Sequence, residues 1–286
     1  MPSHIRSVDA NRSTLVFFAV LLAVGLYRLV VLFTANADLY GDEAYYWGWG
    51  QSLEWGYYSK PPVLGWLIYT TTGLFGSDSE AIVRLASPLT HIATASLVFA
   101  IAAQLYERAV AAWAGLVYFL TPAIWLSSRL ISTDVALLFF WTAAILFFVK
   151  ALQDDTWRYW LLAGLFGGLG LLSKYNMILF PAAAFFFLLS ASEYRPRLLQ
   201  AQFWAAAVVA FVVWLPNLLW NVAHDFPTLK HTAEISHLDQ GLGNPQAFLE
   251  FFGGQFGVFG LLAFPLLLVF AFRTGAKDWR VKLLLW

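Results

Sequence analysis

Long apolar blocks separated by short polar clusters run along the whole chain. A ninth block begins at Val281 and is still running at Trp286. The eight complete blocks are Thr14–Thr34, Ala86–Leu105, Ala109–Leu126, Val135–Val149, Trp160–Leu172, Met177–Ala191, Phe203–Trp220 and Phe251–Phe272. Apolar runs that approach ~20 residues are typical of bilayer-spanning helices. The pattern predicts an all-α polytopic integral membrane protein with about eight or nine transmembrane helices.

Composition agrees with a chain surrounded by membrane lipids. Of the 286 residues, 60% are hydrophobic and 12% charged, whereas soluble domains carry about 25% charged residues. The net charge of zero argues against a nucleic-acid partner. The absence of cysteine excludes disulfides and thiolate metal sites.

The chain reads as one transmembrane domain over residues 1–286, and a run that stops at Trp286 suggests a C-terminally truncated sequence. The first block could be a signal peptide, since Ala35-Asn36-Ala37 imitates a cleavage site. Its length favours a retained helix, because a signal peptide's apolar region spans roughly 7–15 residues. In the fifth block, Gly164 and Gly168 predict close packing against a neighbouring helix.

Basic residues predict the orientation. Eleven Lys and Arg residues flank the blocks on the side of the N-terminus and five flank them on the other, with Arg28 inside the first block. The positive-inside rule therefore places the N-terminus in the cytoplasm. Segments 35–85, 127–134, 173–176 and 221–250 then face outward, and the two long ones collect most of the carboxylates.

The first outward loop, residues 35–85, holds the most suggestive chemistry. Asp42 and Glu43 follow Gly41, where a helix begins that we expect to be amphipathic and to lie in the membrane interface. Lys60 is held just before Pro61-Pro62, where proline restricts the backbone. The alternative is that Asp42-Glu43 is only a helix cap with a solvated acid beside it.

A second acid stands at the start of the fourth block. Asp134 follows Thr133, with Arg129 five residues earlier. Ionisable residues at membrane depth are functional hypotheses by default. The alternative is an N-cap that forms a salt bridge with Arg129.

The outward loop 221–250 contains His224, Asp225 and two further histidines, His231 and His237. The spacing matches no familiar zinc site, so acceptor recognition or simple solvation is the preferred interpretation. We therefore predict no metal site. A bound divalent cation is the less favoured alternative.

The order of several short motifs resembles the bacterial protein-mannosyltransferase-like family, which includes the lipid A aminoarabinose transferase and has the C-type glycosyltransferase fold. The resemblance runs from about residue 14 to the end. The motifs are Asp42-Glu-Ala-Tyr-Tyr-Trp47, Tyr57-Tyr-Ser-Lys-Pro-Pro62, Arg129-x-x-x-Thr-Asp134, Leu172-Ser-Lys-Tyr175 and Trp220-Asn-x-x-His-Asp-Phe-Pro-Thr228.

The resemblance implies an inner-membrane enzyme that takes a sugar from a polyprenyl-phosphate donor on the extracytoplasmic face. The acceptor would be lipid A, a cell-surface glycan or a protein. Some members carry an acid where this chain has Ser59, which puts a bridging metal in doubt. The expected residues are catalytic Asp42, Glu43 and Asp134; phosphate-binding Lys60, Arg129 and Lys174; and substrate-binding Tyr45, Tyr58, His224 and Asp225.

This chemistry suits the residue types. An acceptor hydroxyl needs a base as it attacks the anomeric carbon, and an outward carboxylate is ionised at neutral pH. The phosphate leaving group needs cations where charge develops, although Lys174 could equally be a snorkelling interfacial lysine. The competing functions are a transporter or flippase for a lipid-linked or small polar substrate, and a non-catalytic scaffold. No internal repeat supports the transporter.

Overall fold

The structure is a computed structural model that describes residues 3–235, 245–273 and 278–285. Every regular element in those ranges is a helix, which confirms the predicted all-α class. The α-helices are α1 (Ser3–Thr34), α2 (Gly41–Trp49), α3 (Val63–Phe75), α4 (Glu80–Arg84), α5 (Ala86–Leu105), α6 (Arg108–Leu120), α7 (Pro122–Ser127), α8 (Thr133–Asp154), α9 (Trp157–Leu171), α10 (Leu179–Ser190), α11 (Ala201–Ala223), α12 (Pro227–Ile235), α13 (Pro245–Phe259), α14 (Ala263–Arg273) and α15 (Trp279–Leu285). Two 3-10 helices, η1 (Tyr175–Ile178) and η2 (Arg195–Leu199), flank α10.

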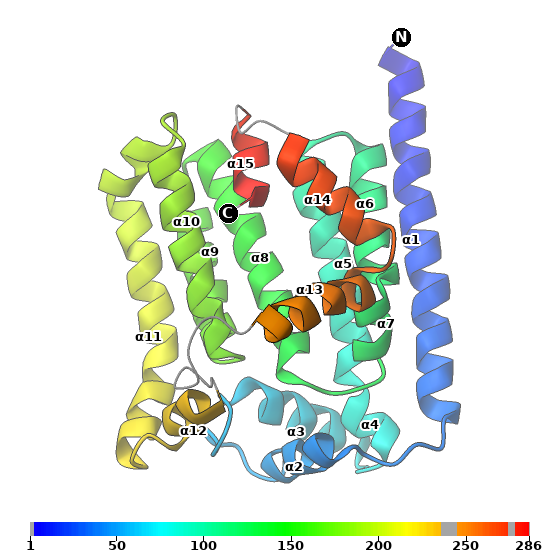
Figure 1. The fold of residues 1–286 in the computed structure, drawn as a ribbon, viewed down its shortest axis with the longest axis vertical. Coiled ribbons are helices and arrows are strands. Elements are labelled where there is room, and N and C mark those ends of the chain that lie inside the picture. Colours follow the sequence, from blue (N-terminus) through cyan, green and yellow to red (C-terminus); the bar gives the residue numbers. More distant parts are fainter. Residues whose placement is uncertain (1–2, 236–244, 274–277, 286) are drawn as a thin grey trace.

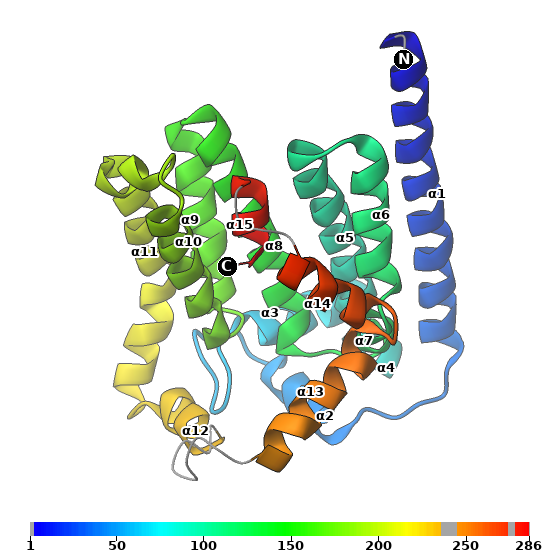
Figure 2. The ribbon, with the colours of Figure 1, turned by 45° about the horizontal axis from the view of Figure 1, so that its top comes forward.

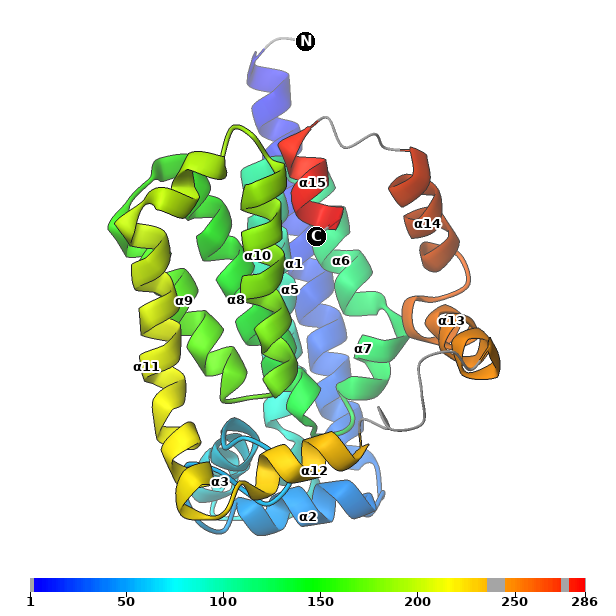
Figure 3. The same ribbon diagram turned by 60° about the vertical axis from the view of Figure 1, so that its left-hand side comes forward.

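The long helices form an upright bundle with one end covered by short helices (Figure 1). In this bundle α5 packs along α6 and α8, and α9 packs along α8 and α11. The short helices α2, α3 and α12 lie across the lower end, while the N-terminus projects from the opposite end. Figure 3 shows α2 and α12 beneath the bundle from another side. Residues 35–85, 127–134, 173–176 and 221–235, all predicted to face outward, lie toward this end, whereas residues 245–250 begin α13 higher up beside the bundle.

The predicted number of spans is not confirmed. Among the described residues, four helices are long and apolar enough to cross a membrane: Ala10–Thr34, Glu80–Leu105, Thr133–Asp154 and Ala201–Ala223. A fifth results if α13 and α14, which are bent by 110° relative to each other, count as one span. The remaining predicted blocks form shorter or interrupted helices.

Two breaks explain part of this difference. The block Ala109–Leu126 is divided between α6 and α7 because Pro122 cannot continue the preceding helix. The block Phe251–Phe272 is divided at Gly260, whose φ of +97° is a conformation that residues other than glycine rarely adopt. Figure 2 shows the sharp turn between α13 and α14.

The first outward segment is more ordered than a loop. Residues Val63–Phe75 form the apolar helix α3, which the sequence interpretation missed although its apolar run was visible. The predicted helix after Gly41 is present as α2, and one of its faces is buried. That face packs against α3 and the start of α5 rather than facing lipid, with Tyr46 and Trp49 in a cluster that includes Leu64, Ile68 and Val83.

The predicted small-residue contact lies between α9 and α11. A Cβ atom added to Gly164 would lie 2.2 Å from the Ala206 carbonyl oxygen, and one added to Gly168 would lie 2.6 Å from Val213 Cβ. Because the Gly164 obstacle is backbone, the two helices cannot keep this spacing around a larger residue.

Gly164→Ala is expected to lower the stability of the bundle by about 1–3 kcal/mol, because the methyl group must push α9 away from α11. Gly167→Ala is the matched control, since its added Cβ meets only Ala210 Cβ at 3.8 Å. Thermal unfolding of both variants in detergent measures the difference. Equal melting temperatures for the two would contradict the packing.

Candidate active site

The acid pair on α2 divides into one exposed and one buried carboxylate. Glu43, Tyr46 and Trp49 recur at three-residue spacing and form the buried face of α2. Asp42 lies on the exposed side in the first helical turn, where the helix dipole favours a carboxylate. It makes no ion pair or hydrogen bond with any residue in the described ranges.

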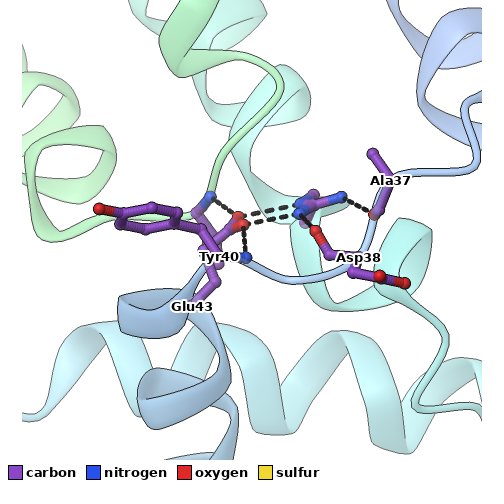
Figure 4. A network of polar contacts seen from close by, with 6 residues as sticks. Ala37, Asp38, Tyr40 and Glu43 are labelled. Carbon is purple, nitrogen blue, oxygen red and sulfur yellow. Dashed lines mark hydrogen bonds and ion pairs between the residues drawn. The ribbon is translucent and has the colours of Figure 1, made fainter.

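Glu43 is held in a buried polar network (Figure 4). Its Oε1 accepts bonds from Arg84 Nε at 2.9 Å and from the Ile131 backbone N at 2.8 Å. Its Oε2 accepts bonds from Arg84 Nη2 at 2.7 Å and from the Tyr40 backbone N at 3.0 Å. Glu43 is 2% exposed and Arg84 6%. This network fixes α2 to α4 and to the segment before α8.

Arg84 extends the network to the segment between α1 and α2. Its Nη1 donates to the Ala37 carbonyl at 2.8 Å and its Nη2 to the Asp38 carbonyl at 2.7 Å. The Glu43 carboxylate therefore has all its strong acceptor positions occupied by protein. This favours a positioning role for Glu43, and its predicted catalytic role remains a prediction.

Asp134 pairs with a different cation from the expected one. It is the second residue of α8, as predicted, but Lys174 Nζ lies 2.7 Å from its Oδ1. The alternative in which Asp134 is an N-cap paired with Arg129 is wrong, since Ser132 occupies the cap position. The carboxylate is half exposed and the pair is accessible. Such a pair contributes no more than about 1 kcal/mol, so a competing anion can displace it.

Lys60 lies in the same patch as both acids. Burial lowers the pKa of Lys60, the nearby charge of Lys174 lowers it further, and the charges of Asp42 and Asp134 oppose the shift. Burial, together with the charges of Asp42 and Asp134, raises the pKa of Tyr46 to about 12. The two acids and two lysines thus act on one region at the lower end of the bundle.

The segment that leads to Lys60 is fastened to α11 and α12. Asn217 Nδ2 donates to the Trp55 carbonyl at 2.7 Å, and Thr228 Oγ1 donates to the Tyr57 carbonyl at 2.7 Å. A Cβ atom at Gly56 would lie 2.4 Å from the Trp220 ring, so glycine permits this close approach. The motif Trp220–Thr228 therefore contributes buried contacts that sequence reasoning did not identify.

The remaining predicted substrate-binding residues are exposed. Tyr45 packs edge-on against Trp49, and the Tyr58 ring lies 5.5 Å from that of His231. The His224 ring stacks on Trp220 at 4.2 Å, and its neighbour Asp225 adopts a left-handed φ of 60°. Among the described residues, none of these four side chains bonds to the acids or lysines of the patch.

Arg129 lies apart from the lysines. It is exposed and lines a hollow of about 390 Å³ together with Asp38, Tyr40 and Arg84. The charges that shift the pKa of Lys60 do not include that of Arg129. Its phosphate-binding role remains a prediction, with less geometric support than that of Lys60 or Lys174.

Within the described ranges, no three His, Asp or Glu side chains come together in a metal-binding group. The His224 ring stacks on Trp220, whereas the His231 ring lies near that of Tyr58. His237 lies outside the described ranges. Ser59 is buried beside Lys60 and supplies no carboxylate.

Sequence reasoning also missed the partners of Arg28. This buried side chain donates to Ser128 Oγ at 2.8 Å and to the Phe119 carbonyl at 2.5 Å, and its guanidinium lies 3.9 Å from the centre of the Phe119 ring. It therefore joins α1 to the last turn of α6 and to the residue that follows α7. Only the unusual position of an arginine inside an apolar block gave a signal.

Comparison with known proteins shows to which family the chain is similar. A family model described as dolichyl-phosphate-mannose-protein mannosyltransferase matches residues 59–220. Lipid A galacturonosyltransferase RgtD of Rhizobium johnstonii is 38% identical over 270 residues, covering 93% of this chain and 56% of that protein. The chain belongs to this glycosyltransferase family. The lipopolysaccharide core galacturonosyltransferase RgtB of the same organism is 31% identical over 217 residues, covering 74% of this chain and 43% of that protein.

The family assignment confirms the resemblance seen in the sequence and the C-type glycosyltransferase fold. The chain spans about half the length of the curated relatives it matches. The segment matched by the family model contains Lys60, Asp134 and Lys174, whereas Asp42 precedes it. The similarity to RgtD, at 93% of this chain, extends over most of the remainder.

Glu43→Gln is expected to lower the free energy of unfolding by about 3–5 kcal/mol, because it leaves the buried Arg84 charge without a counter-ion. Unfolding of the purified protein in detergent measures the change. Glu193→Gln, at an exposed acid whose charge is not among those acting on Arg84, is the control and should be neutral. A Glu43→Gln protein as stable as the control would refute the structural importance of the pair.

Proposed function

We propose that the chain transfers a sugar from a polyprenyl-phosphate donor to a lipopolysaccharide glycolipid. The main supporting observation is the patch that combines the exposed carboxylate of Asp42 with Lys60 and the Asp134–Lys174 pair. The relatives named as lipid A and core galacturonosyltransferases favour a glycolipid acceptor and a galacturonosyl donor.

The proposed reaction needs one base and positive charge. The acceptor hydroxyl oxygen attacks the anomeric carbon while its proton passes to the Asp42 carboxylate. The bond from that carbon to the phosphate oxygen breaks, and the electron pair leaves with the polyprenyl phosphate. Lys60 and Lys174 stabilise the charge that develops on the phosphate oxygens. No metal is required by this scheme, since the two lysines supply the positive charge.

The distribution of basic residues supports an inner-membrane location with the N-terminus in the cytoplasm. The lower end of the bundle, which holds the patch, then faces the extracytoplasmic side. A polyprenyl tail can stay in the bilayer beside the helices while its phosphate reaches this end. The transporter alternative loses support, because the named relatives are transferases.

Asp42→Asn is expected to lower sugar transfer by about 10²–10⁴-fold, because the amide cannot accept the proton. The assay uses membranes containing the full-length protein and a radiolabelled polyprenyl-phosphate–galacturonate donor. Asp42 is exposed, so the variant should fold normally, and Glu80→Gln is the matched control at the same end. Full activity of Asp42→Asn would remove Asp42 from the mechanism.

The pH dependence of donor binding tests Lys60. Because its pKa is lowered, Lys60 loses its positive charge on raising the pH earlier than an ordinary lysine, whose pKa is about 10.4. The KM for the donor should therefore rise as pH increases, with a midpoint below that value. Asp134→Asn removes a negative charge that raises the pKa of Lys60, so the midpoint should move to lower pH. Lys60→Arg stays charged and should abolish this alkaline rise; a rise that persists in Lys60→Arg assigns it to another group.

A further inference from the structure

Asn217 lies at the junction between the two segments that carry the site lysines. It is fully buried on the otherwise largely apolar helix α11. Its Nδ2 donates to the Trp55 carbonyl at 2.7 Å, and its Oδ1 accepts the Tyr175 hydroxyl proton at 2.9 Å. Both ends of one amide are thus used to join two segments that are distant in the sequence.

One of these bonds controls the segment before Lys60. From Trp55 the chain makes a tight turn in which the Tyr57 backbone N donates to the Lys60 carbonyl at 3.1 Å. Thr228, on α12, holds the Tyr57 carbonyl at the same turn. A displacement of Trp55 is therefore transmitted over a few rigid residues to Lys60.

The other bond controls the segment that carries Lys174. Tyr175 is the next residue, and its hydroxyl also accepts a bond from Asn221 Nδ2 at 3.2 Å. A backbone bond from Val63 N to the Leu172 carbonyl, 3.1 Å long, joins the same two segments at another point. The two segments that carry the lysines are thus joined at two points, by the Asn217 side chain and by the Val63–Leu172 backbone bond.

The buried amide of Asn217 indicates a role besides stabilising the fold. A buried amide in an apolar helix costs free energy unless it is fully hydrogen-bonded, and an apolar residue would avoid that cost. Both partners of Asn217 lie within a few residues of a lysine proposed to bind phosphate. Fixed spacing matters here, because two cations stabilise one phosphate only when both reach it together.

We propose that Asn217 is a positioning residue that sets the spacing of Lys60 and Lys174 for the donor phosphate. The proposal rests on the proposed sugar transfer and adds a residue that touches neither the donor nor the acceptor. A purely structural role would reduce the amount of folded enzyme and so lower the apparent kcat. A positioning role weakens donor binding and so raises the donor KM.

The first experiment compares steady-state kinetics of the full-length protein and its Asn217→Leu and Tyr175→Phe variants. Each variant removes two hydrogen bonds between neutral groups, and the weakened connection should raise the donor KM about tenfold or more, with kcat nearly unchanged. The double variant should be no worse than the more affected single variant, because both act through one connection. Asn176→Leu makes the same change at an exposed neighbouring position and is the control.

A second measurement does not depend on activity. The 286 residues contain no cysteine, so spin labels can be attached to Leu53→Cys and Asn176→Cys, both exposed positions. The distance distribution should be narrow in the otherwise unaltered chain and broader with Asn217→Leu.

The outcomes separate the two proposals. Transfer by the wild type with an unchanged donor KM in Asn217→Leu overturns the positioning role and leaves the proposed function intact. No transfer by the wild type with any polyprenyl-phosphate donor overturns the proposed function. A label distribution that Asn217→Leu leaves unchanged overturns the positioning role whether or not transfer is detected.

Discussion

A carboxylate and a guanidinium that are both removed from water must satisfy each other, and the Glu43–Arg84 pair does this at the lower end of the bundle. The free-energy cost of burying two charges is recovered only with good geometry and additional hydrogen bonds. Here the backbone of Tyr40 and Ile131 and the carbonyls of Ala37 and Asp38 supply them. The pair therefore fixes the segment after α1, the start of α2, α4 and the approach to α8 in one arrangement.

The adjacent acids Asp42 and Glu43 consequently lie in different environments. Glu43 points into the protein, and its acceptor positions are filled by donors from other segments. The next face of the same short helix carries Asp42, which is exposed and unpaired among the described residues. A rigidly held helix presents a free carboxylate in a defined direction, which is what a general base requires. The buried acid thus supports the role proposed for the exposed one.

The local features of the site were predictable from the sequence, and the pairings were not. The helix after Gly41, the position of Asp134 at the start of α8 and the close packing of Gly164 against some neighbouring helix follow from local patterns. The choice of Arg84 for Glu43 and of Lys174 for Asp134 depends on contacts across about 40 residues, which no local period encodes. The helix breaks at Pro122 and Gly260 had visible signals, but the length of each apolar block concealed them.

The charge balance of the patch bears on how a phosphate would enter it. Lys60 forms no ion pair with any described residue, whereas Lys174 is already paired with Asp134. An incoming phosphate would therefore meet Lys60 first and compete with Asp134 for Lys174, which costs little because that pair is accessible to water. Displacing Asp134 would leave a second carboxylate near the reacting carbon. Asp42 would remain the only acid in the patch whose contacts with described residues do not have to be broken before it can accept a proton.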